Sequence, residues 1–249
     1  MTATQQATAL FVYAVVPADR ELPDGLTGVD DAPVELVQHG PVAAVVGRMA
    51  ADRPPGRRAD LTAYSSVVDA LAPEGAVAPM RFGTVVADHD TLLDELLAPR
   101  ADDLAAELAE LEGTTQYHLR VTYVEDAVLV EITAADPRVR ALREATRGLP
   151  EDARVGDRIK LGELVTRAWE RWAHADADRI LAEIVPMVTT YRMRREPGLS
   201  AVLDVALLVD RDRAQELEDR LEAMAAEAHV RMRLRLAGPM APYDFVGSG

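Results

Sequence analysis

Apolar residues recur along this chain with the spacing of strands in some segments and with the spacing of helices in others. This alternation predicts a fold that contains both. Residues 9–17, ALFVYAVVP, are apolar on both faces and end at a proline, which is typical of a buried central strand. Residues 34–49 form two β-rich halves joined by His-Gly-Pro, so they predict a hairpin. Apolar residues then repeat at helical spacing from Leu61 to Leu71, and Asp60 is placed to cap that helix.

The pattern returns to strand character over residues 76–88 and then becomes a long acidic stretch of helical period. One stripe of this stretch carries Leu93, Leu96, Leu97, Leu104, Leu108 and Leu111. Because Pro99 lies inside the stretch, we expect the helix to kink or split there. The first part of the chain therefore reads β-ββ-α-β-α. It predicts a smaller α+β sheet domain over residues 1–114, with a trailing acidic helix.

The second part of the chain combines alternating strands with firm helical patterns. Residues 117–123 alternate between apolar and polar positions and predict a half-buried strand, and apolar spacing predicts a helix over residues 161–185. The remaining segments read as strand, strand, helix and strand, over residues 189–194, 199–210, 211–229 and 230–238. Glu196-Pro197-Gly198 predicts the turn between the middle strands. Residues 125–155 are compatible with a strand and a helix, or with two short helices.

With residues 125–155 set aside, the second part reads β-α-β-β-α-β. This is the ferredoxin-like order, in which an antiparallel sheet carries its helices on one face. The predicted fold class is therefore α+β with two domains, divided near Gly113. The C-terminal domain, residues 115–249, is expected to be ferredoxin-like and to end in an extended tail rich in proline and aromatic residues.

Composition narrows the function classes. The formal net charge of −15 disfavours general binding to nucleic acid or to anionic lipid. The chain has no cysteine, which excludes disulfides, thiol catalysis and cysteine-ligated metals and fits a reducing compartment. The N-terminal apolar run is too short to span a bilayer and lacks the basic flank of a targeting signal. We therefore expect a soluble cytoplasmic protein that binds neither nucleic acid nor membrane.

The sequence contains no recognisable catalytic, cofactor or metal motif. None of the five histidines pairs with another at a metal-binding helical spacing. HADAD, residues 174–178, lacks the EF-hand pattern, so we interpret it as a solvated helix face. GDRIKLGE, residues 156–163, lacks the P-loop order because Lys160 is followed by leucine. We predict no catalytic residue, no metal and no cofactor.

Basic side chains gather on one face of the predicted C-terminal sheet. In VRMRLRL, residues 230–236, the apolar side chains face one way and the arginines the other. The last strand of a ferredoxin-like sheet lies beside the first, so one helix-free face is predicted to collect His118, Arg120, Arg192, Arg194, Arg231, Arg233 and Arg235. Asp204 is a candidate partner within the same sheet.

Guanidinium groups at this density repel one another unless something negative covers them. RNA is one candidate cover, although SAVLDVALLV, residues 200–209, lacks the aromatic residues on which bases stack. The acidic helix of the same chain, around Asp102 and Glu107, is a second. The third is an acidic surface of another protein, since the guanidinium fork binds carboxylates with two hydrogen bonds.

Two short motifs resemble one known family. PMRFGTVV, residues 79–86, is similar to the Pro-Leu-Arg-Phe-Gly-Thr motif of the GvpF/GvpL family of gas vesicle proteins. LAGPMAPYDFV, residues 236–246, is similar to the Gly-Pro-x-Pro-Pro-Tyr-x-Phe motif that closes members of that family. The chain departs from the family at Met80, where leucine is usual, and at Met240 and Ala241, where tryptophan and proline are common.

The resemblance implies an accessory protein of gas vesicle formation with no established catalytic activity. Members of the family are two-domain α+β proteins with a ferredoxin-like C-terminal part. They are thought to bind the small hydrophobic shell protein and other accessory proteins during nucleation or growth, so a gas vesicle location is implied. Two alternatives are a small-ligand-sensing regulatory protein built on ferredoxin-like modules and an enzyme with its site at the domain cleft.

The C-terminal tail concentrates prolines and scarce aromatic residues. Gly238-Pro239 and Ala241-Pro242 are expected to stop the last strand and to force an extended path, on which Tyr243 and Phe245 project to the same side. One interpretation packs these rings between the domains, beside Arg81 and Phe82, with Gly83 permitting close backbone approach. The other interpretation is a hook that binds a partner.

Overall fold

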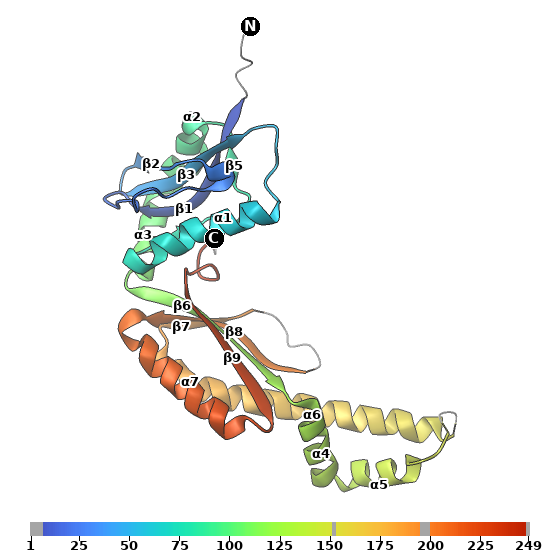
Figure 1. The fold of residues 1–249 in the computed structure, drawn as a ribbon. Coiled ribbons are helices and arrows are strands. Elements are labelled where there is room, and N and C mark those ends of the chain that lie inside the picture. Colours follow the sequence, from blue (N-terminus) through green and yellow to red (C-terminus); the bar gives the residue numbers. More distant parts are fainter. Residues whose placement is uncertain (1–6, 151–152, 195–199, 248–249) are drawn as a thin grey trace. The chain divides into compact units, whose positions relative to one another are not determined.

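The computed structural model describes residues 7–150, 153–194 and 200–247, and its chain divides into two compact units (Figure 1). The first unit comprises Met1–Gln116 and Pro239–Gly249, and the second comprises Tyr117–Gly238. Each unit contains one antiparallel sheet, so the fold is mixed α/β. The junction lies two residues from the expected boundary, and the tail belongs to the first unit, whereas we had assigned it to the C-terminal domain.

The sheet of the first unit is organised around its first strand. Its five strands are β1 (Thr8–Pro17), β2 (Val34–His39), β3 (Val42–Ala50), β4 (Ala78–Pro79) and β5 (Val85–Val86). The order is β2-β3-β1-β4, and β5 also pairs with β1. Leu10 to Val16 are buried on both faces, which confirms the central strand. The β2–β3 hairpin is confirmed as well, and Gly40 at its turn has a φ of 55°.

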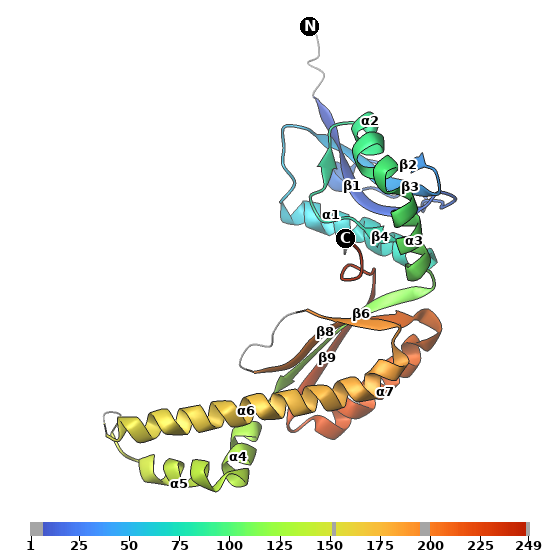
Figure 2. The ribbon, with the colours of Figure 1, turned by 180° about the vertical axis from the view of Figure 1, so that it is seen from behind.

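Helices cover both faces of this sheet. Helix α1 (Arg58–Leu71) packs Tyr64, Val67, Val68 and Leu71 into the same core as Phe11 of β1. Helix α3 (Ala101–Leu111) contacts β1 and β3, and Figures 1 and 2 show it on the face opposite α1. The strand is buried on both sides because it lies between these two layers.

The acidic helical stretch is irregular at Pro99, as expected. It begins with the short helix α2 (His89–Thr91), continues as a π-helical turn over Leu92–Leu97 and tightens to a 3-10 turn at Ala98–Arg100 before α3. Leu92 and Leu97 are the fully buried leucines of the π-helical turn, whereas Leu93 is only partly buried. The predicted stripe included Leu93 and not Leu92, and the wider i→i+5 turn of the π-helix changes which leucines face the core.

The sheet of the second unit has the order β7-β8-β6-β9. Its strands are β6 (Thr114–Tyr123), β7 (Thr190–Met193), β8 (Ala201–Asp210) and β9 (Met232–Met240). Helices α6 (Val155–Ile184) and α7 (Ala214–Ala228) lie on one face of it (Figure 2) and bury Ile184 and Leu217 against the inward residues of the strands. The expected turn at residues 196–198 lies outside the described residues.

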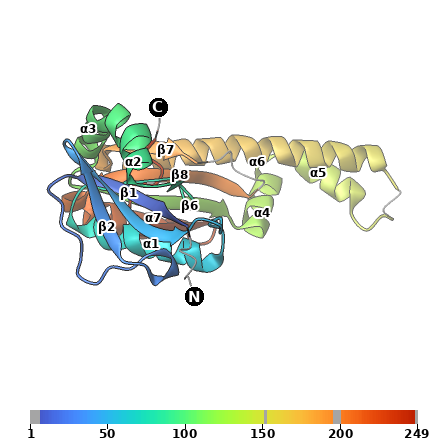
Figure 3. The same ribbon diagram turned by 90° about the horizontal axis from the view of Figure 1, so that it is seen from above.

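The ambiguous segment forms two short helices, which was one of the two alternatives. These are α4 (Glu125–Ala135) and α5 (Pro137–Thr146). Helix α6 is longer than the periodicity predicted, and α5 packs along it while α4 contacts both. Figure 3 shows the N-terminal part of α6 extending past the sheet with α5 beside it. The second unit therefore carries a helical extension between its first and second strands.

Asp60 secures the start of α1 from inside its first turn. Its carboxylate accepts hydrogen bonds from the backbone N–H groups of Gly56 (3.0 Å) and Arg57 (2.9 Å) and pairs with both terminal nitrogens of Arg53 at 2.8 and 3.0 Å. The Asp60 residue is buried, at 3% exposure. The hydrogen bond from Arg53, with those from the backbone, holds the pKa of Asp60 well below its usual range.

We expect Asp60→Asn to lower the melting temperature by about 5 °C near neutral pH, because charge-assisted hydrogen bonds are lost. A carboxyl group whose pKa is depressed on folding contributes stability above its unfolded pKa, near about 4, and loses that contribution as the pH falls further. The difference in melting temperature between wild type and variant should therefore begin to narrow below about pH 4 and close only as the pH approaches the depressed folded pKa. Asp52→Asn, at an exposed neighbouring position, is the matched control. A pH-independent difference would contradict this account.

Candidate interaction surfaces

The Arg81–Thr84 motif forms a tight turn that is tied to the central strand. The backbone N–H and the Oγ1 hydroxyl of Thr84 both donate to the carbonyl oxygen of Arg81, at 3.0 and 2.7 Å. The carbonyl of Thr84 accepts from Val12 N at 2.9 Å. Gly83 has a φ of 88°, which disfavours residues with a Cβ. A Cβ at this position would meet only Pro55, at 3.7 Å, which is an ordinary contact. Glycine is therefore needed for its positive φ and not, as we had expected, for close approach of another backbone segment.

Tyr64 of α1 joins this turn to the C-terminal tail. Its hydroxyl donates to the carbonyl of Met80 at 2.5 Å, and its ring meets Phe82 edge-on with 5.5 Å between ring centroids. The ring centroids of Tyr243 and Tyr64 are 6.2 Å apart. Burial raises the pKa of Tyr64 to about 12 and also raises the pKa of Tyr243. The structure therefore brings Phe82 and Tyr243 into one aromatic cluster of the first unit.

Hydrogen bonds hold the rest of the tail in the same unit. The Gln116 side chain donates to the Asp244 carboxylate at 2.5 Å and accepts from Asp244 N at 2.9 Å. Gly247 N donates to the Glu107 carboxylate at 2.7 Å. Ala241 is fully buried, and Phe245 is 8% exposed. The tail rings thus pack within the first unit, and a role in locking the domain angle stays a prediction.

The path of the tail differs from the expected one in two ways. Strand β9 continues through Gly238 and Pro239 and ends only at Met240. Because β9 is an edge strand, a proline whose missing N–H points away from the sheet removes no ladder hydrogen bond. After the strand, Tyr243 N donates to Ala241 O and Phe245 N to Pro242 O, so the chain turns twice instead of running extended.

The helix-free face of the second sheet carries most of the predicted basic residues. Met232, Leu234 and Leu236 of β9 pack toward the helices, so the exposed Arg233 and Arg235 point to the other face. The members of this basic sheet face are His118 and Arg120 on β6, Arg192 and Arg194 on or beside β7, and Arg233 and Arg235 on β9.

Asp204 is the anionic centre of the basic sheet face, as suggested from the sequence. His118 Nε2 lies 2.6 Å from Asp204 Oδ1, and Arg194 Nε lies 3.8 Å from the same oxygen. Arg192 is paired across the strands with Ala206, two residues beyond Asp204 and on its side of β8. One carboxylate thus serves a group of cations on the open face.

Arg231 does not belong to the basic sheet face, and this part of the prediction was wrong. It precedes β9, and its N–H closes the turn after α7 by donating to Ala228 O at 2.8 Å. Its guanidinium binds both carboxylate oxygens of Asp176 on α6, at 3.0 and 2.8 Å. Val230, expected to face inward, is 66% exposed. Strict alternation fails here because the strand starts two residues later than the pattern predicted.

Asp176 is a buried, charged residue whose importance the sequence analysis did not predict. We had interpreted HADAD as a solvated face, but Asp176 is 7% exposed and also accepts from the Tyr123 hydroxyl at 2.5 Å. Arg231 further pairs with Glu131 of α4 at 3.0 Å and lies over the rings of Tyr123 and Trp172. The position of Asp176, four residues after Trp172 on the buried stripe of α6, was the available signal.

Metal and membrane features are absent from the described parts of the chain. Within residues 7–150, 153–194 and 200–247, no three His, Asp or Glu side chains gather to hold a metal ion. Over the same ranges, no helix is both long enough and apolar enough to cross a bilayer.

Fold and surfaces together define a two-unit mixed α/β protein with two antiparallel sheets. The family model "Gas vesicle synthesis protein GvpL/GvpF" matches residues 9–247. Gas vesicle protein F of Streptomyces sp. (strain CB03234) is 30% identical over 239 residues, covering 95% of this chain and 98% of the relative. Gas vesicle protein L of the same organism is 32% identical over 256 residues, covering 95% and 92%. The chain belongs to the GvpL/GvpF family of gas vesicle proteins, as the motifs indicated.

Solved structures show the same fold. The crystal structure of the gas vesicle protein GvpF from Anabaena sp. PCC7120 superposes with a TM-score of 0.84 at 18% identity, covering 97% of this chain and 99% of that chain. The GvpF structure from Microcystis aeruginosa gives 0.77 at 20% identity, covering 95% and 98%. The fold is therefore common to chains that share few residues.

We expect Phe245→Ala to lower the free energy of unfolding by roughly 3 kcal/mol, because it removes a buried ring from the tail. Urea unfolding followed by circular dichroism measures this change. Val246→Ala, at the adjacent half-buried position, should cost clearly less. If Phe245→Ala unfolds like wild type, the ring does not anchor the tail.

Removing Asp176 should be costly, since it takes away the carboxylate that binds two nitrogens of the Arg231 guanidinium and leaves only Glu131 beside it. We expect Asp176→Ala to lose about 3 kcal/mol or more, and the double variant Asp176→Ala/Arg231→Met to recover part of that loss. Asp178→Ala, two residues along at an exposed position, is the matched control. Equal stability of the two single alanine variants in urea titrations would refute the importance of the pair.

Proposed function

We propose that this protein is a non-catalytic accessory factor of gas vesicle formation that binds the shell protein and other accessory proteins during nucleation or assembly. The observation that carries the proposal is the family match over residues 9–247, which spans both units and the tail. A ligand-sensing regulatory role, the alternative considered from the sequence, has no support in the comparisons. The comparisons likewise give no support to the third alternative, an enzyme with its site at the domain cleft.

The basic sheet face is our candidate contact for an acidic part of such a partner. Arg120, Arg233 and Arg235 are exposed on it, in a chain whose formal net charge is −15. Guanidinium groups bind carboxylates with two parallel hydrogen bonds, so this face suits a partner with acidic side chains. The negative charge of the remaining surface would keep a complex with a hydrophobic shell subunit dispersed.

Two finer descriptions belong to the same proposal. We propose that the second unit is ferredoxin-like, which its strand order β7-β8-β6-β9 and the helices on one face support. We also propose that the protein works in the cytoplasm in association with the gas vesicle. The lack of cysteine fits a reducing compartment.

We expect purified protein to capture the gas vesicle shell protein, and capture to weaken as salt rises from about 50 to about 500 mM, because salt screens exposed charges. Arg233→Glu/Arg235→Glu should reduce capture about tenfold, the equivalent of 1.4 kcal/mol. The control Arg58→Glu/Arg100→Glu makes the same charge change at exposed positions of the first unit.

Each alternative result has a distinct meaning. Capture that ignores salt and both double variants would assign the contact to an apolar surface. Failure to capture the shell protein or any other gas vesicle protein would contradict the proposed function itself.

A further inference from the structure

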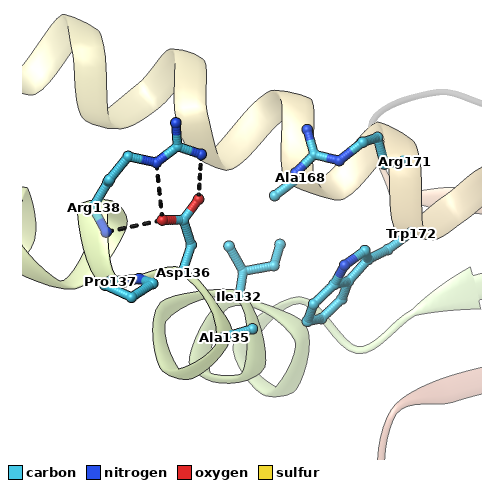
Figure 4. Close-up of a pocket in the computed structure, with 8 residues that line it drawn as sticks. All are labelled: Ile132, Ala135, Asp136, Pro137, Arg138, Ala168, Arg171 and Trp172. Atoms are coloured by element: carbon cyan, nitrogen blue, oxygen red, sulfur yellow. Dashed lines mark hydrogen bonds and ion pairs between the residues drawn. The ribbon is translucent and has the colours of Figure 1, made fainter.

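A cavity of about 530 Å³ lies in the helical extension of the second unit, where α4 and α5 meet α6. Figure 4 shows its residues: Ile132 of α4 and Ala168 of α6 lie at its base, Trp172 closes one end, and Arg138 faces it from the other. All of these residues come from the segment inserted between β6 and β7. The basic sheet face and the tail contribute nothing to it.

The base of this cavity is apolar and belongs to the core of the second unit. Ile132 is 1% exposed and Ala168 is 4% exposed, so both are fixed by the core around them. The Trp172 ring is held from another side by Arg231, whose guanidinium carbon lies 5.3 Å from the ring centroid. A pocket with such walls suits an apolar side chain, which gains free energy by leaving water.

The rim of the cavity carries two arginines, one of which is paired with a carboxylate of the rim. Arg138 is held by Asp136, which accepts from its Nε at 3.3 Å and from its Nη2 at 3.0 Å, as the dashed lines in Figure 4 mark. Asp136 also caps α5 by accepting from Arg138 N at 2.8 Å. Arg171 is exposed, reaches over Ala168 in Figure 4, and has no ion-pair partner among the described residues. It is available to a carboxylate from outside.

The surroundings of the cavity are basic, unlike the chain as a whole. Residues 136–171, which include the lining residues of α5 and the rim carboxylate Asp136, contain nine arginines and lysines against seven aspartates and glutamates, while the whole chain has a formal net charge of −15. The α5–α6 pair, which carries most of these basic residues, extends past the sheet (Figure 3). A long basic surface beside a pocket favours a polypeptide segment over a small ligand, because only a segment can use both.

We propose that this cavity binds an acidic amphipathic segment of a partner gas vesicle protein. An apolar side chain of the segment enters between Ile132, Ala168 and Trp172, and a neighbouring carboxylate of the segment binds the Arg171 guanidinium. Further acidic residues of the segment follow the basic α5–α6 surface. This inference rests on the proposed function and adds a second contact, separate from the basic sheet face.

The test uses the full chain and purified gas vesicle proteins of the same cell, including the shell protein. Capture is measured for wild type, for Arg171→Glu, which reverses the free cation, and for Ala168→Trp, which fills the cavity. Each variant should weaken capture of at least one partner about tenfold. Arg100→Glu, at an exposed position of the first unit, is the control for charge reversal, and capture should be close to wild type.

Trp172 supplies a direct report of occupancy. The chain has two tryptophans, so Trp169→Phe leaves Trp172 as the single fluorophore. With excitation restricted to tryptophan, which avoids the six tyrosines, its emission should change saturably with the captured partner, and the change should be lost in the Arg171→Glu background. Trp169 packs edge-on against Tyr123, so its replacement could itself disturb the core. The indole N–H resonance of Trp172, followed by NMR in the otherwise wild-type protein, provides a second readout that does not depend on that substitution.

The outcomes separate the two proposals. Capture by wild type that neither Arg171→Glu nor Ala168→Trp weakens overturns the cavity as a docking site and leaves the proposed function standing. Absence of capture by wild type overturns both. Saturation of the Trp172 signal by 4-phenylbutyrate at the same concentration as the partner would assign the cavity to a small carboxylate and overturn the polypeptide ligand.

Discussion

The buried ion pair between Arg231 and Asp176 is the interaction on which the second unit depends most. Asp176 lies in the middle of α6, and Arg231 lies at the point where α7 ends and β9 is about to begin. Their double hydrogen bond, with Tyr123 as a third member, joins three segments that are far apart in the sequence. Asp176 is buried, so loss of the Arg231 guanidinium would leave its carboxylate in the core without its closest cationic partner.

Because of this pair, the arginines at positions 231, 233 and 235, which alternate regularly in the sequence, do not all lie on the same face of the sheet. Arg233 and Arg235 stay on the open face of the sheet, whereas Arg231 turns to the helices and supports the Trp172 ring. The second unit therefore offers two basic regions of different character. One is a flat face with Asp204 at its centre, and the other is a pocketed helical extension with an apolar base.

In the first unit, the corresponding role belongs to Tyr64. Its ring and hydroxyl bring together the Arg-Phe-Gly-Thr turn and the C-terminal tail, the two motifs by which the family is recognised. Both motifs are thus explained as structure, since Gly83 adopts a positive φ and Ala241 and Phe245 are buried.

The sequence by itself determined the family, the order of most elements, the central strand, the β2–β3 hairpin and the inward and outward sides of β9. These follow from local periods and turn residues, which act over a few positions. It could not choose between the alternatives for residues 125–155, place the tail in the first unit or reveal that Asp176 is buried. Those outcomes depend on partners distant in sequence, such as Arg231 for Asp176 and Tyr64 for Tyr243, so only the tertiary structure decided them.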